Sequence, residues 1–315
     1  MSVATRCRVK TRAQGSSGSP TGNKTALITG GNTGIGYETA ASLLGKGYNV
    51  ILGCRNEEKG RAAMNRLEPF ARKGGSSLDL AVFDLADLHS VSDYTKRALD
   101  ADTRIDVLLN NAGIMACPLM RTRQGFEQQI GVNHLGHFLL TNNLLPLLEK
   151  SAATHQDARI INVASSAHYP GTIDFDDMSW EKKEYSKWGA YCQSKLANVM
   201  FSYELSRRLQ NSGITVNALH PGVVATELGR YLFPSLSSEE ELPWWSKPLL
   251  SVATSFLLTP EQGAQTSIYL ASSPDVAGVT GKYYDSCKPK NSSNESYDLE
   301  KQRKLWERSE ELVTL

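Results

Sequence analysis

The stretch "TGGNTGIG", residues 29–36, joins an apolar run to a helical pattern through a glycine-rich turn, and this arrangement indicates the type of fold. The glycines at positions 30, 34 and 36 allow a tight bend and the close approach of a pyrophosphate to a helix N-terminus, where free N–H groups favour an anion. The spacing is G-x-x-x-G-x-G and no Lys-Ser or Lys-Thr pair follows, so the turn is not a P-loop. We therefore predict a dinucleotide site whose first contacts are Gly30, Asn32, Thr33, Gly34, Ile35 and Gly36.

Strand-like apolar runs alternate with helical patterns along the rest of the chain. The apolar runs occupy residues 25–30, 49–54, 77–84, 105–113, 159–166 and 214–222. The helical patterns occupy residues 34–46, 57–72 and 91–99, and a long helix begins near Tyr191. Short buried strands separated by amphipathic helices indicate a parallel sheet with helices on both faces. The sequence predicts an α/β fold, a doubly wound parallel sheet of the Rossmann type, in a single domain over residues 23–315.

The composition makes several classes of protein improbable. The 315 residues carry a net charge of +1, which gives no reason to expect nucleic acid as a partner. No apolar run approaches the roughly 18 residues that a membrane-spanning helix needs. The five cysteines are scattered and form no metal-ligand spacing, so we expect no metal.

The segment of residues 1–22 precedes this domain and is basic. The first 37 residues contain no Asp or Glu, and the segment is rich in Ser and Arg. Acid-poor segments of this kind are typical of organelle transit peptides. We expect a plastid location on this ground; the alternative is a disordered tail on a cytoplasmic protein.

The end of the second apolar run carries information on the cofactor. The position where dinucleotide-binding folds place an acidic residue for the ribose hydroxyl here holds Cys54 and Arg55. A guanidinium pairs with a phosphate, so NADP(H) is favoured over NAD(H). Asp84 ends the third run and Leu85 follows it, and Asp84 is placed to contact the adenine or to cap the next helix.

Further motifs produce a family resemblance. After the glycine-rich turn come "NNAG" (residues 110–113), Asn133, "VASS" (163–166), "YCQSK" (191–195) and "HPGVVAT" (220–226). In this order and spacing they resemble the short-chain dehydrogenases/reductases, over essentially residues 24–285. The resemblance adds Asn111, Ala112, Gly113, Pro221, Gly222, Val223 and Thr226 to the expected cofactor contacts, the last four in a loop that closes over the nicotinamide.

The resemblance also implies a catalytic tetrad of Tyr191, Lys195, a serine and Asn133. Tyr191 would be the general acid/base, and the i, i+4 spacing puts Lys195 on the same helix face. The lysine would lower the pKa of Tyr191 and bind the nicotinamide ribose, which makes both residues cofactor contacts as well. The serine would orient the substrate carbonyl, and Asn133 would hold a water molecule that relays protons.

Two adjacent residues, Ser165 and Ser166, are candidates for the serine of the tetrad. Between Ser166 and Tyr191 lie 24 residues, a longer segment than in many family members. This segment resembles the retinol dehydrogenase branch and its plastid relatives, in which the second serine of the pair is catalytic. On that resemblance we choose Ser166 over Ser165.

The resemblance implies a small apolar aldehyde, ketone or alcohol as substrate, as in enzymes of retinol and retinal. Residues 231–258 lie where the family builds a substrate lid, and their aromatic and leucine side chains could line a pocket, touch a membrane surface peripherally or simply pack. Two alternatives remain open. One is a plastid reductase of the protochlorophyllide type; the other is a redox-sensing interaction protein of the chloroplast import machinery type, with residues 298–313 as a partner-binding helix. The oligomeric state stays open.

Overall fold

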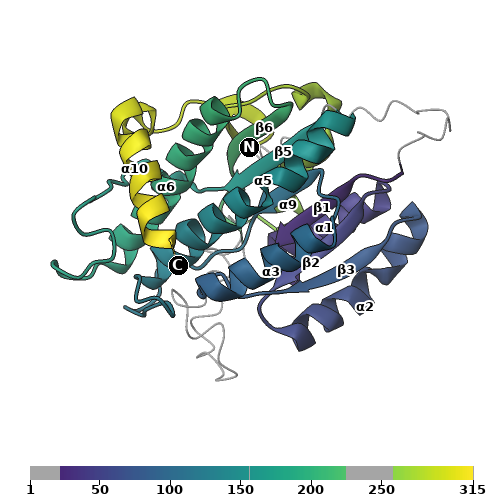
Figure 1. Ribbon diagram of the computed structural model, residues 1–315, viewed down its shortest axis with the longest axis horizontal. Helices are drawn as coiled ribbons and strands as arrows, with labels where there is room; N and C mark the ends of the chain where they lie inside the picture. The colour runs from purple at the N-terminus through teal and green to yellow at the C-terminus, as the bar shows by residue number, and fades with distance from the viewer. Residues whose placement is uncertain (1–21, 156, 225–257, 315) are drawn as a thin grey trace, which may run out of the picture.

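The computed structural model describes residues 22–155, 157–224 and 258–314. They form one eight-stranded sheet in the order β3-β2-β1-β4-β5-β6-β7-β8 (Figure 1). All neighbouring strands are parallel except the pair β7 and β8. The strand order reverses between β1 and β4, the switch point at which doubly wound sheets bind ligands. The strands are β1 (Thr25–Thr29), β2 (Asn49–Cys54), β3 (Leu78–Val82), β4 (Val107–Asn110), β5 (Ala158–Val163), β6 (Ile214–His220), β7 (Lys282–Asp285) and β8 (Lys288–Lys290).

The central strands are apolar on both faces, which explains their continuous hydrophobic runs. Along β1, Leu27 belongs to the core on one face of the sheet, whereas Ala26 and Ile28 belong to the core on the other. Successive side chains of a strand point to opposite faces, so a strand covered on both sides needs apolar residues at every position. The apolar runs therefore predicted a sheet buried between two layers of helices.

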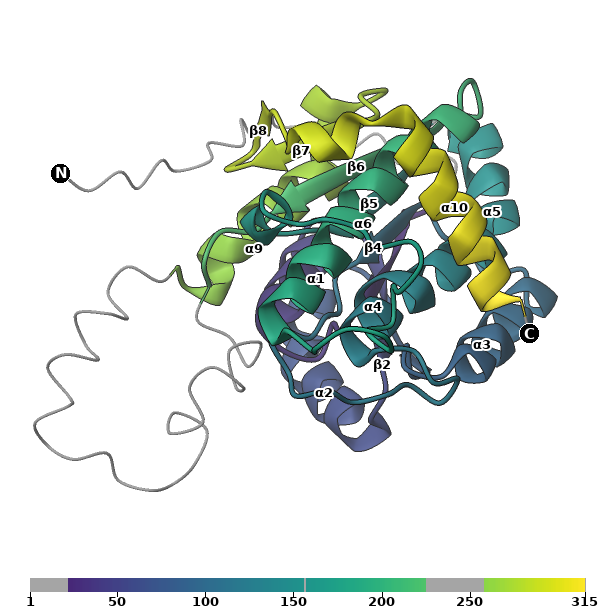
Figure 2. The same cartoon turned by 90° about the vertical axis from the view of Figure 1, so that its left-hand side faces the viewer.

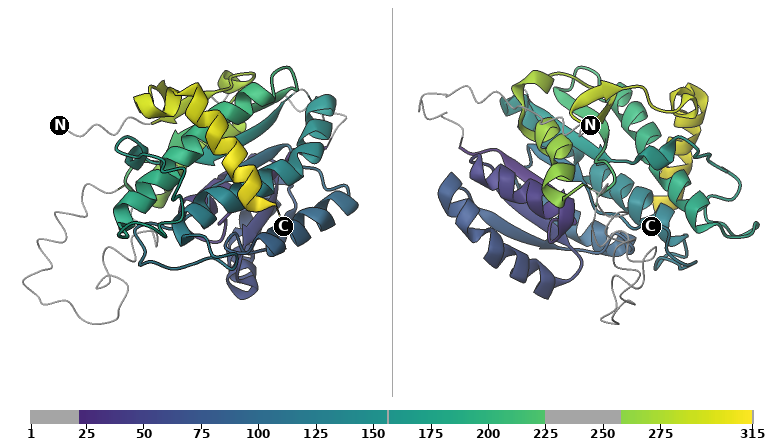
Figure 3. Two further views of the ribbon diagram at one scale, coloured as in Figure 1. Left: turned by 60° about the vertical axis from the view of Figure 1, so that its left-hand side comes forward. Right: turned by 180° about the vertical axis from the view of Figure 1, so that it is seen from behind.

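Two sets of helices supply those layers. The core on one face includes side chains of α3 (Leu88–Asp100), α5 (Gly136–His155) and α6 (Lys187–Arg208), which lie in front of the sheet in Figure 1. The core on the other face includes side chains of α1 (Gly34–Gly45), α2 (Glu57–Gly74) and α9 (Pro260–Ser272). Figure 3 (right) shows α1 and α9 covering this face from behind. The predicted α/β fold is confirmed.

The helix α10 (Leu299–Val313) packs on the outside of the first layer and crosses α6 (Figure 2). Its Trp306 ring lies 4.9 Å from the Phe138 ring and 5.8 Å from the Phe201 ring, measured between centroids. Trp306 is only 5% exposed. The apolar face of α10 is thus occupied by its own domain, which argues against the alternative in which this helix recruits a partner.

Local signals set most element ends, and the described elements start close to their predicted bounds. The helix α3 begins three residues earlier than predicted, at Leu88, because the Asp87 side chain accepts a hydrogen bond from the His89 N–H and caps it. Asp84 therefore does not cap this helix; its carboxylate accepts a hydrogen bond from the Ala86 N–H at 2.9 Å.

Within the described residues, no helix has the length and apolarity needed to cross a membrane. The basic segment lies outside them, apart from Gly22.

Candidate active site

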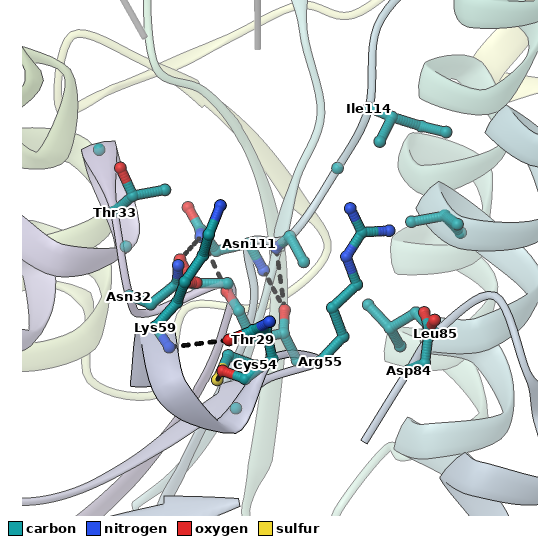
Figure 4. A pocket seen from close by; sticks show the side chains of 18 of the residues that line it. Thr29, Asn32, Thr33, Cys54, Arg55, Lys59, Asp84, Leu85, Asn111 and Ile114 are labelled. Carbon is teal, nitrogen blue, oxygen red and sulfur yellow. Dashed lines mark hydrogen bonds between the residues drawn. The ribbon is translucent and has the colours of Figure 1, made fainter. Parts of the chain in front are cut away.

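A cleft of about 500 Å³ opens at the carboxyl ends of β1, β2 and β4, at the switch point. Figure 4 shows the Arg55 side chain reaching into it, between Asn111 on one side and Asp84 with Leu85 on the other. The cleft is lined by Thr29, Gly30, residues 32–36, 53–56, Lys59, Ala62, Arg66, residues 83–85, 111–114, Gln128 and Val132. All predicted contacts of the glycine-rich turn, Arg55, Asp84, Leu85 and residues 111–113 belong to this lining.

The glycine-rich turn packs closely against the start of α1 and the segment after β4 because it lacks side chains at two positions. Gly30 has a φ of +64°, in the left-handed region that L side chains rarely adopt. A Cβ at Gly36 would lie 2.4 Å from the Gly30 carbonyl oxygen and 2.6 Å from Nδ2 of Asn111. The N-terminus of α1 consequently faces the cleft without obstruction, and its free N–H groups suit a pyrophosphate.

Hydrogen bonds tie this turn to the end of β4. The Thr29 hydroxyl accepts hydrogen bonds from the backbone N–H groups of Asn111 and Ala112, each at 2.9 Å. The Asn111 side-chain amide returns a bond of 2.8 Å to the Thr29 carbonyl. Two neighbouring walls of the cleft are thus fixed to each other before any ligand binds.

Three cationic side chains gather at one end of the cleft: Arg55, Lys59 and Arg66. The Arg66 guanidinium lies 4.5 Å from the centre of the Tyr37 ring and donates a 3.2 Å hydrogen bond to the Asn32 carbonyl. Sequence reasoning found Arg55 and missed the other two. Their spacing in the sequence could have identified Lys59 and Arg66, because positions 59 and 66 are two helical turns apart and share one face of α2.

Tyr191 and Lys195 lie on α6 and both are buried, at 3% and 3% exposure. Burial raises the pKa of Tyr191 to about 12, and a hydrogen bond with the Ser165 side chain opposes that rise. Burial lowers the pKa of Lys195 to about 8. The lysine Nζ donates to the Val163 carbonyl at 3.1 Å and lies 5.7 Å from the centre of the tyrosine ring.

Asn133 lies in a π-helical turn, Gly131–Leu135, between α4 (Gln128–Ile130) and α5. Its amide bridges two parts of the site: Nδ2 donates to the Ile114 carbonyl at 3.0 Å and to the Ser194 hydroxyl at 2.9 Å. A Cβ at Gly113 would lie 3.2 Å from Oδ1 of Asn133 and 3.5 Å from Nζ of Lys195. Gly113 therefore joins the cleft to the predicted catalytic side chains.

The two adjacent serines differ in what they touch. The Ser165 side chain bonds Tyr191 and accepts a hydrogen bond from the Ala167 N–H at 3.2 Å. Ser166 begins a 3-10 turn and is exposed, and its N–H donates to Nδ1 of His220 at 3.2 Å. The side chain that meets Tyr191 is thus that of Ser165, which leads us to propose Ser165 for the catalytic position in place of our choice of Ser166.

The predicted loop over the nicotinamide is described only as far as residue 224. Gly222 has a φ of +87°, and the Val223 carbonyl accepts a 2.8 Å hydrogen bond from the Leu258 N–H. Pro221, Gly222 and Val223 do not line the cleft. Thr226 and most of the predicted lid, residues 231–257, lie outside the described residues.

The site fits a nicotinamide dinucleotide, since a glycine cradle, a helix N-terminus and a cationic end line a single cleft. Acidic, cysteine and histidine side chains do not cluster into a metal site anywhere in the described ranges.

Comparisons with known proteins agree with this assignment. The sequence pattern of the short chain dehydrogenase family matches residues 24–236. Human retinol dehydrogenase 13 is 47% identical over 296 residues, covering 93% of this chain and 85% of that protein. The solved structure of an uncharacterized protein from Mycobacterium paratuberculosis superposes with a TM-score of 0.69 at 34% identity, over 93% of this chain and 94% of that one. The NADP complex of RhlG from Pseudomonas aeruginosa gives a TM-score of 0.64 at 26% identity, over 84% of this chain and 94% of that one.

Proposed function

The chain belongs to the short-chain dehydrogenase/reductase family, and from that premise we propose that it transfers a hydride between NADP(H) and an apolar aldehyde, ketone or alcohol. It is an oxidoreductase similar to the retinol dehydrogenases. The observation that carries the proposal is the closeness of Gly113, which lines the cleft, to the buried side chains of Asn133 and Lys195. NADP(H), when bound, supplies or accepts the hydride at its nicotinamide ring.

The cationic end of the cleft supports NADP(H) over NAD(H). Arg55, Lys59 and Arg66 can neutralise a phosphate, and no carboxylate follows Cys54 at the end of β2 to hold a ribose hydroxyl. We expect Arg55→Ala to raise the KM for NADPH at least about tenfold and to leave the KM for NADH nearly unchanged. Arg61→Ala is the matched control, since it removes an exposed arginine that pairs with Glu57 on the helix α2, which follows Arg55. An equal rise of both KM values would contradict the assignment.

The side chains of the site divide the proton chemistry among them. In the reductive direction, Tyr191 donates its phenolic proton to the carbonyl oxygen as hydride reaches the carbonyl carbon. Burial favours the neutral phenol, which is the form that can donate. The Ser165 hydroxyl, already bonded to Tyr191, orients the same oxygen. Lys195, with a pKa of about 8, supplies positive charge beside the phenolate and can pass a proton back to it. In the oxidative direction these roles reverse.

An apolar carbonyl or alcohol is the substrate class that the retinol dehydrogenase similarity supports. A test combines NADPH with a panel of apolar aldehydes, retinal and steroid ketones. Tyr191→Phe should lower kcat by at least about a hundredfold and leave NADPH binding intact, because only the transferable proton is removed. Tyr48→Phe, at a half-buried tyrosine outside the cleft, is the control. Equal turnover by Tyr191→Phe and the unaltered protein would refute the mechanism, and tight NADPH binding without turnover by either would favour the redox-sensing alternative.

A plastid location and peripheral membrane contact belong to the same proposal and rest on sequence alone. The acid-poor composition of residues 1–22 supports the first, with the cytoplasm as the alternative. The apolar residues of 231–258 support the second. Import of a fluorescent protein fused to residues 1–30 into isolated plastids tests the location, and sedimentation with liposomes tests the contact. A plastid reductase of the protochlorophyllide type has no observation in its favour beyond that N-terminal composition.

A further inference from the structure

A second cleft, of about 550 Å³, lies beside the start of α6 and is separate from the cleft that suits the dinucleotide. Its lining consists of Pro118 from the segment after β4 and of residues 184–188 at the start of α6. Trp188 stands one helical turn before Tyr191. The two rings meet edge to face, with 6.1 Å between centroids. This second cleft therefore adjoins the side chain proposed to move the proton.

Trp188 is 44% exposed although its indole is among the largest apolar side chains. Leaving such a ring in water forgoes the free energy of its burial, so a ligand that covered the ring would gain that free energy. Pro118, on the facing wall, is also exposed and apolar. Glu184 and Lys187 at the edge carry opposite charges, so the cleft offers no net attraction to a charged ligand.

A buried side chain holds the two walls at a fixed separation. Gln129 is fully buried, and its Oε1 accepts a 2.8 Å hydrogen bond from the Ala116 N–H on the wall that carries Pro118. Its Nε2 donates to the Lys187 carbonyl at 2.9 Å and to the Tyr185 hydroxyl at 3.0 Å on the wall that carries Trp188. The buried side-chain amide of Gln129 thus connects the two walls of the second cleft.

Glu127 reinforces this bridge and connects it to Asn133. Its carboxylate accepts hydrogen bonds from the Gln129 N–H and the Ile130 N–H, each at 2.9 Å, and from the Tyr185 hydroxyl at 3.0 Å. These bonds cap α4, which continues directly into the π-helical turn of Asn133. The segment of residues 167–190, which lengthens the distance between the serine pair and Tyr191, is therefore anchored by buried polar groups and carries Trp188 at a defined place.

Resting on the proposed function, we propose that this second cleft binds the apolar body of the substrate, and that Trp188 is a specificity-determining residue. An extended hydrocarbon chain or flat ring system would pack between Trp188 and Pro118 while its carbonyl group lies at Tyr191. Gln129 acts as a positioning residue, since it touches the walls and not the ligand. Short aldehydes, which end at Tyr191, do not reach the indole.

The test compares a long and a short substrate of the same reactivity, decanal and propanal, with NADPH saturating. Trp188→Ala should lower kcat/KM for decanal at least about tenfold and change that for propanal less than about twofold, because packing surface is lost only with the longer chain. Trp188→Phe should retain most of the preference. Phe70→Ala is the matched control, since Phe70 is a similarly exposed aromatic side chain on α2, outside both clefts. Equal losses for both aldehydes, or no loss for decanal, would overturn the proposal.

Gln129→Leu provides a second readout, because it removes the bridge and keeps a similar volume. It should lower the decanal-to-propanal preference, and Trp188→Ala in the same chain should add little to that loss. If the unaltered protein reduces neither aldehyde, the proposed function fails. The second cleft can then still be tested by measuring the binding of retinal. In the Tyr191→Phe background, retinal should quench tryptophan fluorescence with a Kd that Trp188→Ala raises at least about tenfold; an unchanged Kd would overturn the inference independently.

Discussion

His137 joins the glycine-rich turn to the π-helical turn of Asn133, with one ring nitrogen bonded to each. Nε2 lies 2.9 Å from the Thr29 hydroxyl oxygen, and Nδ1 lies 3.1 Å from the Asn133 carbonyl oxygen. The Asn133 carbonyl oxygen can only accept a hydrogen bond, and the neutral ring carries one proton. Nδ1 therefore carries the ring proton and donates it to Asn133. Burial lowers the pKa of His137 to about 4, which keeps the ring neutral and this arrangement intact at pH 7.

Replacing His137 should reveal this connection. His137→Phe keeps the volume and removes both bonds, so we expect about 1–3 kcal/mol lower free energy of unfolding and a fall in kcat larger than the rise in KM for NADPH. His137→Asn, which can restore the bond to the Asn133 carbonyl, should recover part of kcat. Urea unfolding and steady-state kinetics measure the two effects. A lower free energy of unfolding with an unaltered kcat would show that His137 contributes to packing alone and not to the reaction.

The glycine at position 36 should tolerate no side chain. Gly36→Ala places a Cβ 2.4 Å from the Gly30 carbonyl oxygen, so the turn must open and the dinucleotide cradle with it. We expect NADPH affinity, measured by fluorescence titration, to fall at least about tenfold. Gly45→Ala is the control at the other end of the same helix, where a Cβ meets nothing within 4 Å. That variant should bind NADPH normally and be as stable as the parent or up to about 1 kcal/mol more so. Similar binding by both variants would show that the turn does not cradle the cofactor.

Replacing Ser165 and replacing Ser166 should have different effects on kcat/KM. Ser165→Ala removes the hydroxyl that bonds Tyr191 and should lower kcat/KM by about a hundredfold. Ser166→Ala removes an exposed hydroxyl and keeps the backbone N–H that bonds His220, so it should change kcat/KM less than about threefold. The reverse order of effects would restore Ser166 to the catalytic position.

Stability should decrease as the pH falls from 7 to 5.5. Burial lowers the pKa of His134 to about 3 and that of His137 to about 4, so the folded state leaves both rings neutral where the unfolded chain, with a pKa near 6.5, takes up protons. The unfolded state binds more protons in this window, and each ring should cost about 1 kcal/mol at pH 5.5. Glu127 has the opposite effect, because burial raises its pKa.

Urea unfolding at pH 7.0 and pH 5.5 measures this dependence. His134→Gln retains a polar partner for the Ser309 hydroxyl, which bonds Nε2 of His134 at 2.8 Å, and removes one titrating ring. The difference in unfolding free energy between the two pH values should shrink in this variant. An unchanged difference would mean that His134 does not contribute to it.

The architecture and most of the residues that line the cleft were predictable from the amino-acid sequence, because both depend on local chemistry. Continuous apolar runs predicted strands covered on both faces, and glycines 30 and 36 predicted the place where a backbone approaches a ligand. The guanidinium of Arg55 at the end of β2 followed from its position after an apolar run. Each of these signals occupies a few consecutive residues.

The contacts between side chains that are far apart in the chain could not be predicted from the sequence. Nothing near residue 165 indicates that Ser165, rather than Ser166, faces Tyr191, since the outcome depends on the direction of one strand end relative to α6. The same holds for Gln129, whose amide bridges two segments that lie 13 and 58 residues away. Hydrogen-bond partners of this kind are selected by packing of the whole domain, which fixes their positions to within tenths of an ångström, and no local propensity encodes that selection.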